Sequence, residues 1–95
     1  MIKEKLNDKE AKAQFELLTG LQKHINAIRK DFTVYDIAKM HHLKRLCAEN
    51  IDNELDIVKS GIAKAKAIPI HKDNADVLKE IERKYKFFLS QAKKL

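Results

Sequence analysis

The sequence predicts an all-α protein, with three helices in an antiparallel arrangement and a central helix much longer than its neighbours. Two glycines and one proline in 95 residues leave few points at which regular structure would break. Abundant Lys, Glu, Leu, Ala and Ile favour helix over strand. Apolar residues recur at steps of three and four and do not alternate. We therefore expect residues 1–95 to form a single helical domain with one modest core.

The first helix is predicted over about residues 9–30. Gly20 falls inside it and costs a helix about 1 kcal/mol. The apolar pattern keeps its phase across Gly20, so we expect one helix bent at this point, or alternatively two short helices joined at residues 19–20. The steps are those of a helix that packs along another helix, and the apolar positions are Leu18, Leu21, Ile25, Ile28 and Phe32.

The second helix is predicted over about residues 34–66, after a short connection at residues 31–33. Thr33 is a favourable N-cap residue, and Asp36 stands three positions later, where a capping box has an acidic partner. The helix would exceed thirty residues and reach about 50 Å, well beyond the average length. Breaks at residues 52–53 or 60–61 remain alternatives.

The excess length of this helix has a consequence for assembly. Its apolar positions continue at steps of three and four from Ile37 to Ala65, further than two shorter neighbours could cover. A second copy of the chain could cover the remainder, so we expect a homodimer or a higher oligomer.

The third helix is predicted over about residues 74–95. Pro69 cannot continue a helix, so residues 69–72 are predicted to form a loop. Asp73 or Asn74 would then cap the helix. Its apolar positions repeat as heptads, namely Leu78, Ile81, Tyr85, Phe88, Ala92 and Leu95.

The formal net charge of +6 favours an anionic partner. The chain has 17 lysines and three arginines, which predicts attraction to phosphate more than bidentate readout of bases. Its one cysteine, Cys47, rules out an internal disulfide and fits a reducing compartment. The first six residues hold no apolar run of a signal peptide, and no stretch is long enough to span a membrane. We therefore expect a cytoplasmic protein without a membrane partner.

Motifs of enzymes are missing from the sequence. It contains no P-loop, no G-x-G-x-x-G and no G-x-S-x-G, so we expect no enzymatic activity and no cofactor. The histidines and the cysteine lack the C-x-x-C or H-x-x-x-H spacing of a zinc site, so we expect no bound metal and a buried Cys47. The residues considered as ligands are His24, His41, His42, His71 and Cys47.

Basic residues gather in two runs without acids, residues 39–45 and 59–72, and along one stripe of the third helix. Acids concentrate in residues 49–56. This segregation predicts binding of RNA or DNA mainly through phosphate contacts, while a solvated lysine-rich surface is the ordinary alternative. The candidate nucleic-acid-binding residues are Lys39, Lys44, Arg45, Lys64, Lys66, Lys79, Arg83 and Lys86.

Two further segments bear on nucleic-acid binding. Phe87 lies beside Lys84 and Lys86 and is expected to pack against a neighbouring helix or subunit, or else to stack on a base. Residues 33–39, Thr-Val-Tyr-Asp-Ile-Ala-Lys, resemble the opening of the helix-turn-helix of the lac repressor family. That resemblance implies a turn, commonly with glycine, and then a recognition helix. Residues 40–44 contain no glycine, and no residue roles are carried over.

The sequence thus leaves two classes of function. The first is a small regulatory or accessory protein, of the kind found in phages and mobile elements, that binds nucleic acid. The second is a helical protein-binding module, such as an inhibitor or an antitoxin-like or immunity-like factor, that docks on an acidic protein through its charged and apolar faces.

Overall fold

The computed structural model describes residues 8–95, and every regular element in this range is a helix. Helix α1 spans Asp8–Ile37, α2 spans His41–Lys66 and α3 spans Lys72–Ala92. The predicted all-α fold is therefore confirmed. Residues 1–7, which include the segment examined for a signal peptide, lie outside the described residues. No helix in the described range is both long enough and apolar enough to cross a lipid bilayer.

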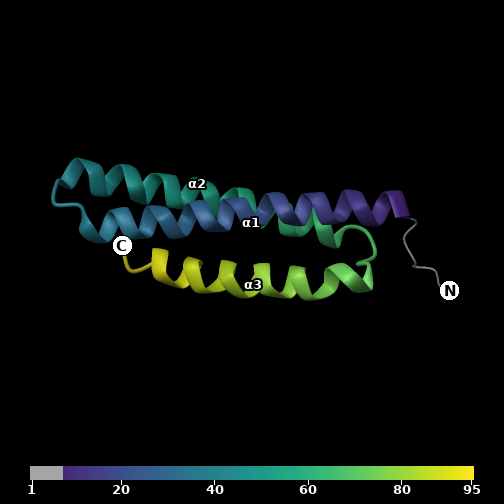
Figure 1. The fold of residues 1–95 in the computed structure, drawn as a ribbon. Coiled ribbons are helices and arrows are strands. Elements are labelled where there is room, and N and C mark those ends of the chain that lie inside the picture. The colour runs from purple at the N-terminus through teal and green to yellow at the C-terminus, as the bar shows by residue number, and fades with distance from the viewer. Residues whose placement is uncertain (1–7) are drawn as a thin grey trace.

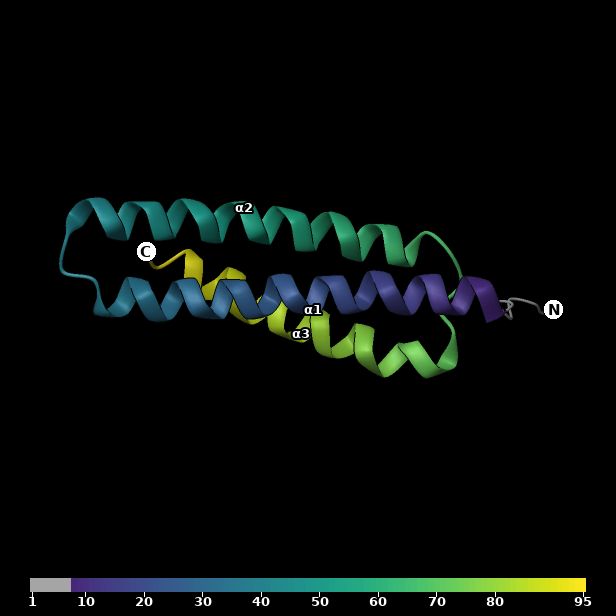
Figure 2. The same cartoon turned by 45° about the horizontal axis from the view of Figure 1, so that its top comes forward.

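The three helices form an elongated bundle. Helices α1 and α2 make an antiparallel hairpin, and α3 returns along it in the direction of α1 (Figure 1). The principal extents are 55 × 20 × 17 Å. Figure 2 shows that α3 stops short of the α1–α2 turn, so the end of the hairpin extends beyond it.

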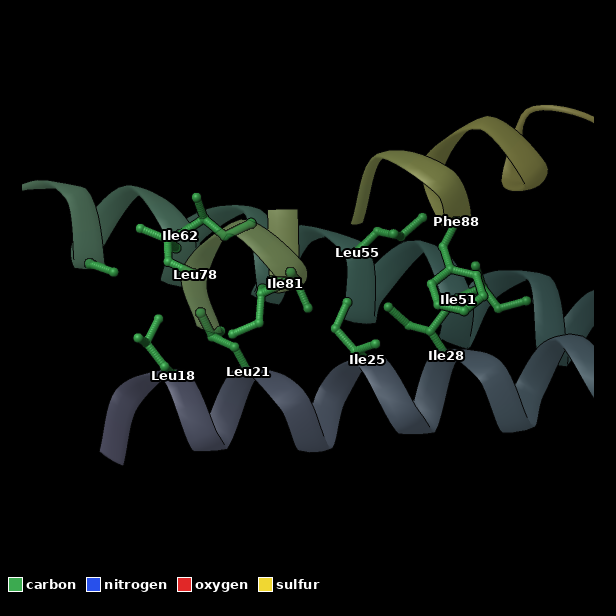
Figure 3. Close-up of a cluster of buried hydrophobic side chains, with 12 residues drawn as sticks. Leu18, Leu21, Ile25, Ile28, Ile51, Leu55, Ile62, Leu78, Ile81 and Phe88 are labelled. Carbon is green, nitrogen blue, oxygen red and sulfur yellow. The ribbon is translucent and has the colours of Figure 1, made fainter. Parts of the chain in front are cut away.

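The core lies where the apolar faces of all three helices meet. Leu21 and Ile25 of α1 point toward Ile81 of α3, with α2 closing the third side (Figure 3). Predicted apolar positions of all three helices supply this core. Its buried members are Leu18, Leu21, Ile25, Ile28, Ile51, Leu55, Val58, Ile62, Ala65, Leu78, Ile81 and Phe88.

The boundary between the first two helices differs from the prediction. Helix α1 continues to Ile37, and the turn occupies residues 38–40. Thr33 is therefore no N-cap, and its hydroxyl donates a hydrogen bond to the carbonyl oxygen of Arg29 at 3.1 Å inside α1. Phe32, placed in the predicted connection, packs against the core and stacks on Phe88.

This boundary also changes the relative lengths. Helix α2 has 26 residues and α1 has 30, so the prediction of an overlong central helix is wrong. Both helices are unbroken, and the considered breaks at residues 19–20, 52–53 and 60–61 do not occur. The argument for an oligomer from an uncovered excess of helix is thereby removed.

The predicted loop around Pro69 is present, but α3 begins earlier than expected. Its N-cap is His71, whose Nδ1 accepts a hydrogen bond from the backbone N–H of Asp73 at 3.1 Å. Neither Asp73 nor Asn74 caps the helix, because Asn74 turns inward and is buried. Helix α3 ends at Ala92, and Leu95 lies beyond it, exposed.

Gln14 and Asn74 form a buried polar contact that fixes the start of α3 on α1. The Gln14 side chain is 2% exposed, and its Nε2 donates to the carbonyl oxygen of Pro69 at 3.0 Å. Its Oε1 accepts from the His71 N–H at 3.0 Å and from Asn74 Nδ2 at 2.8 Å. Asn74 Nδ2 also donates to the carbonyl oxygen of Ala11 at 3.2 Å. Because each of these buried groups has a partner, the contact costs little in desolvation and specifies one arrangement of the loop.

Candidate nucleic-acid interface

The outward face of α3 carries a line of cations. Successive cations of this line are seven, four, three and seven residues apart, and these spacings place them on one side of the helix. That side lies opposite the buried side chains Leu78, Ile81 and Phe88. All the cations are exposed, and Asp76 is the one acid among the positions of this face. We call this set the α3 stripe; its members are Lys72, Lys79, Arg83, Lys86 and Lys93.

The members of the α3 stripe differ in how free their charges are. Arg83 donates from Nη2 to Glu80 Oε1, and from Nε to Glu80 Oε2 at 3.4 Å. The hydrogen bond from Arg83 lowers the pKa of the Glu80 carboxyl, and Glu80 in turn raises the pKa of Arg83. Lys79 and Lys86 make no hydrogen bond or ion pair with residues 8–95. They are therefore the stripe's most available phosphate contacts.

A hollow of about 590 Å³ lies between the first half of α2 and the carboxyl end of α3. Ala92 and Leu95 line it and flank Lys93, so the α3 stripe leads to its edge. The charged or polar lining consists of Tyr35, His41, His42, Lys44, Arg45 and Asp52.

Lys44 has a fixed position in this hollow. Its Nζ donates to the carbonyl oxygen of Tyr35 at 2.8 Å and lies 4.4 Å from the centre of the Tyr35 ring. These two contacts hold the ammonium group in place, with cation–π attraction adding to the hydrogen bond. Arg45, one residue later, is exposed and has no partner among residues 8–95.

The amino end of α2 adds positive potential beside the hollow. Its N-cap, Met40, has extended backbone (φ −84°, ψ 129°), and no side chain accepts from the N–H groups of the first turn. The first turn also contains no acid. The unopposed helix dipole therefore favours anions here, and Lys39 lies in the adjoining turn.

Two of the predicted residues lie apart from the others. Lys66 forms an ion pair with Glu82 of α3 at 2.6 Å, so its charge is already offset. Lys64 lines a different hollow, of about 380 Å³, whose walls come from α1 and α2 alone. The structure therefore brings together Lys79, Arg83 and Lys86 on α3. It places Lys44 and Arg45 in the hollow near the end of that line and Lys39 in the α1–α2 turn beyond it, and it separates Lys64 from both.

Some cations were missed by the sequence analysis. Lys72 was assigned to a loop, although it stands seven residues before Lys79 and joins the same face of α3. The seven-residue spacing would have placed it there. A second, sparser group of exposed lysines lies on the outward face of α1, at Lys12, Lys23 and Lys30.

The groove between α1 and α2 holds the chain's other ionisable contacts. His24 Nδ1 lies 2.5 Å from Glu54 Oε2. Asp31, on the same side of α1, is half-buried and has no hydrogen-bonding partner among the described residues. Burial raises the pKa of Asp31, the negative charge of Glu54 raises it further, and Lys30 opposes the rise. Within residues 8–95, no group of three or more His, Cys, Asp or Glu side chains is arranged to hold a metal ion.

Residues 33–39 do not open a helix-turn-helix. Thr33 to Ile37 form the last turns of α1, and the helix after the turn runs back antiparallel to α1 (Figure 1). Cys47 is a buried free thiol, as predicted. Phe87 is 55% exposed and packs edge-on against Phe88, with 5.4 Å between ring centroids.

The chain matches no protein-family model, and no curated protein or solved structure is detectably similar to it. The function therefore has to be inferred from the surface of the bundle.

Proposed function

We propose that this protein binds nucleic acid, RNA or DNA, through phosphate contacts made by the α3 stripe. The observation that carries the proposal is the alignment of five exposed cations along one face of α3, with a single acid among them. At 1.5 Å per residue, the line from Lys72 to Lys93 is about 31 Å long. A nucleic-acid backbone is a continuous line of negative charge that such a row can follow.

The residue types favour contacts without sequence specificity. Four of the five stripe residues are lysines, whose ammonium groups on long flexible stems attract phosphates as point charges. Arg83 is the one guanidinium, and Glu80 already occupies part of its donor fork. Binding then comes from counterion release and should fall steeply as salt is added.

The hollow at the end of α3 extends this surface. Lys44 and Arg45 lie beside the uncapped amino end of α2, where backbone N–H groups also attract anions. A backbone that follows the α3 stripe past Lys93 would meet these groups next. Asp52 on the far wall would repel it, which limits the path to the near side of the hollow.

The proposal is tested by titrating the full chain into labelled single-stranded RNA, single-stranded DNA and duplex DNA while fluorescence anisotropy is recorded. We expect dissociation constants of about 1–100 µM near physiological salt. We also expect log K to fall linearly with log salt, with a slope set by about three to five phosphates. Absence of binding to all three probes at low salt would contradict the proposal. It would favour the docking of the same stripe on an acidic protein.

A further inference from the structure

The side of the α1–α2 hairpin that faces away from α3 has no helix over it, and its surface is unlike the rest of the molecule. Exposed positions on this side of α2 recur at steps of three and four, from residue 43 to residue 60. These six positions are uncharged, whereas Lys64, the next position of the series, is charged and lines the same groove together with Asp56. We call this set the α2 back stripe; it consists of Leu43, Leu46, Asn50, Asn53, Ile57 and Ser60.

Helix α1 contributes the other wall of this groove, and its side chains are mostly small. The residues at positions 13, 20, 27 and 34 are Ala, Gly, Ala and Val, so they repeat every seven residues on one face of α1. The two ionisable side chains of α1 nearby are His24 and Asp31. We call the small residues the α1 back stripe: Ala13, Gly20, Ala27 and Val34, followed by Ala38 in the turn after α1. No atom of a neighbouring element would lie within 4 Å of a Cβ placed on Gly20, so its wall is open. The 380 Å³ hollow lies in this groove.

The two walls are complementary when residues at the same level, meaning the same height along the helix axes, are compared. Tyr35 contacts Lys44 and His24 contacts Glu54, which fixes how α1 and α2 align. In this alignment Val34 is level with Leu46. Ala27 is level with Asn53, and Ile57 falls between the levels of Gly20 and His24. At the levels of Leu46 and Ile57 the α2 wall carries the larger side chain, whereas Gly20 and Ser60, which share a level, are both small.

We infer that this groove binds the same groove of a second copy, so that two hairpins pack back to back as a four-helix core with α3 of each copy on the outside. A twofold axis parallel to the helices places α1 of one copy over α2 of the other at the same level. Each Leu or Ile of the α2 back stripe then meets a small residue of the partner. A twofold axis perpendicular to the helices would instead place the large side chains of one copy against the large side chains of the other, and small against small. Such an arrangement packs poorly.

The charges fit the same arrangement. Asp31 is half-buried beside Glu54 and has no hydrogen-bonding partner within the described part of the chain. In the inferred dimer it lies near the levels of Glu49 and Asn50 of the other copy, and the side-chain amide of Asn50 can donate to it. The twofold places no pair of like charges between the back stripes. The stripes are uncharged and the charges beside them, Lys64 and Asp56, are of opposite sign, so a self-complementary partner fits better than a uniformly acidic or basic one. Both α3 stripes stay exposed.

The test is the mass of the full chain in solution, measured by sedimentation equilibrium over a range of concentrations. We expect a mass of about 22 kDa, twice the 11.0 kDa of one chain. The double variant Leu46→Glu, Ile57→Glu should raise the dimer dissociation constant about tenfold or more, because it places charges in the groove. The matched control Phe15→Glu, Ile68→Glu alters two equally exposed apolar residues outside the groove and should leave it unchanged.

A cross-linking experiment tests the register separately. In a Cys47→Ala background, an Ala27→Cys chain and an Asn53→Cys chain should form a disulfide-linked dimer when mixed and not when oxidised alone. Linkage of either variant to itself would overturn the parallel axis. A mass of 11.0 kDa at every concentration, or a dimer unaffected by Leu46→Glu, Ile57→Glu, would overturn the interface. Circular dichroism shows whether each variant keeps its helices.

Discussion

Gly61 of α2 lies directly against Leu21 of α1. A Cβ built on Gly61 would overlap Leu21 Cδ2 and lie 3.0 Å from its Cγ. Leu21 is a buried member of the core and cannot move aside without disturbing its neighbours. The absence of a side chain at Gly61 is therefore what allows α1 and α2 to approach so closely at this level.

We expect Gly61→Ala to lower the free energy of unfolding by about 1–2 kcal/mol, since overpacking outweighs the gain in helix propensity. Gly20→Ala is the matched variant, because nothing would contact the added methyl group within the chain. It should raise the free energy of unfolding by about 0.5–1 kcal/mol. Urea denaturation at low protein concentration measures both, and equal effects of the two substitutions would show that the helices do not meet at Gly61.

Replacement of Gln14 tests the buried polar contact at the start of α3. Gln14→Leu removes the acceptor of the His71 N–H and of Asn74 Nδ2, and the donor to Pro69. We expect a loss of about 2–3 kcal/mol, because buried polar groups are left without partners. Hydrogen exchange at the His71 amide should accelerate more than the loss of global stability explains. Gln22→Leu, at an exposed position of α1, serves as the control and should change neither quantity.

The amino end of α2 can be stabilised by a single substitution. Met40 is the N-cap and has the extended backbone that a capping residue needs, but its side chain cannot accept a hydrogen bond. Met40→Ser should add about 1 kcal/mol to the free energy of unfolding. Thr33→Ala should change it by less than about 0.5 kcal/mol, because Thr33 lies within α1. Loss of stability in Thr33→Ala alone would instead indicate a helix that starts there.

Asp31 should make stability depend on pH. Its folded-state pKa is raised, chiefly by burial and then by Glu54. The stabilising contribution is therefore fully present below the ordinary pKa of 3.8 and is lost as the pH rises through the raised value. At neutral pH the Asp31 carboxylate opposes folding, so Asp31→Asn should raise the urea midpoint at pH 7 and have little effect near pH 3. Asp56→Asn, at an exposed position on α2, should shift the midpoint at neither pH.

The sequence predicted the helices better than the turn between the first two. Apolar steps of three and four identified the core faces of all three helices, because these residues repeat at the helical period over many turns. The turn at residues 38–40 contains neither glycine nor proline, and residues 31–33 imitate a cap more closely. Local sequence signals therefore predicted the turn between the first two helices at the wrong residues. Packing of Phe32 on the core keeps α1 helical beyond it, and that contact involves Phe88, 56 residues later.

The candidate interface was predicted in part for a similar reason. Lys79, Arg83 and Lys86 share one helix, so their spacing alone places them on one face. Lys64 and Lys66 are close in sequence, but one lines the α1–α2 groove and the other pairs with Glu82. Their spacing of two residues places them on different faces of α2, but only the packing of the helices decides what each face meets. The Gln14–Asn74 contact likewise joins residues 60 positions apart, and no local sequence pattern predicts it.

The role of the α3 stripe is tested most directly by two charge reversals measured side by side. The first variant is Lys79→Glu, Arg83→Glu, Lys86→Glu, and the second is Lys12→Glu, Lys23→Glu, Lys30→Glu on the outward face of α1. Both change the formal net charge equally and alter only exposed side chains.

In titrations against the nucleic-acid probe that binds best, the α3 variant should weaken binding about a hundredfold and reduce the salt slope by about three phosphates. The α1 variant should weaken binding only a few-fold, and its salt slope should stay close to that of the unaltered chain. Equal losses in the two variants would show that binding follows net charge alone, and would contradict an interface on α3.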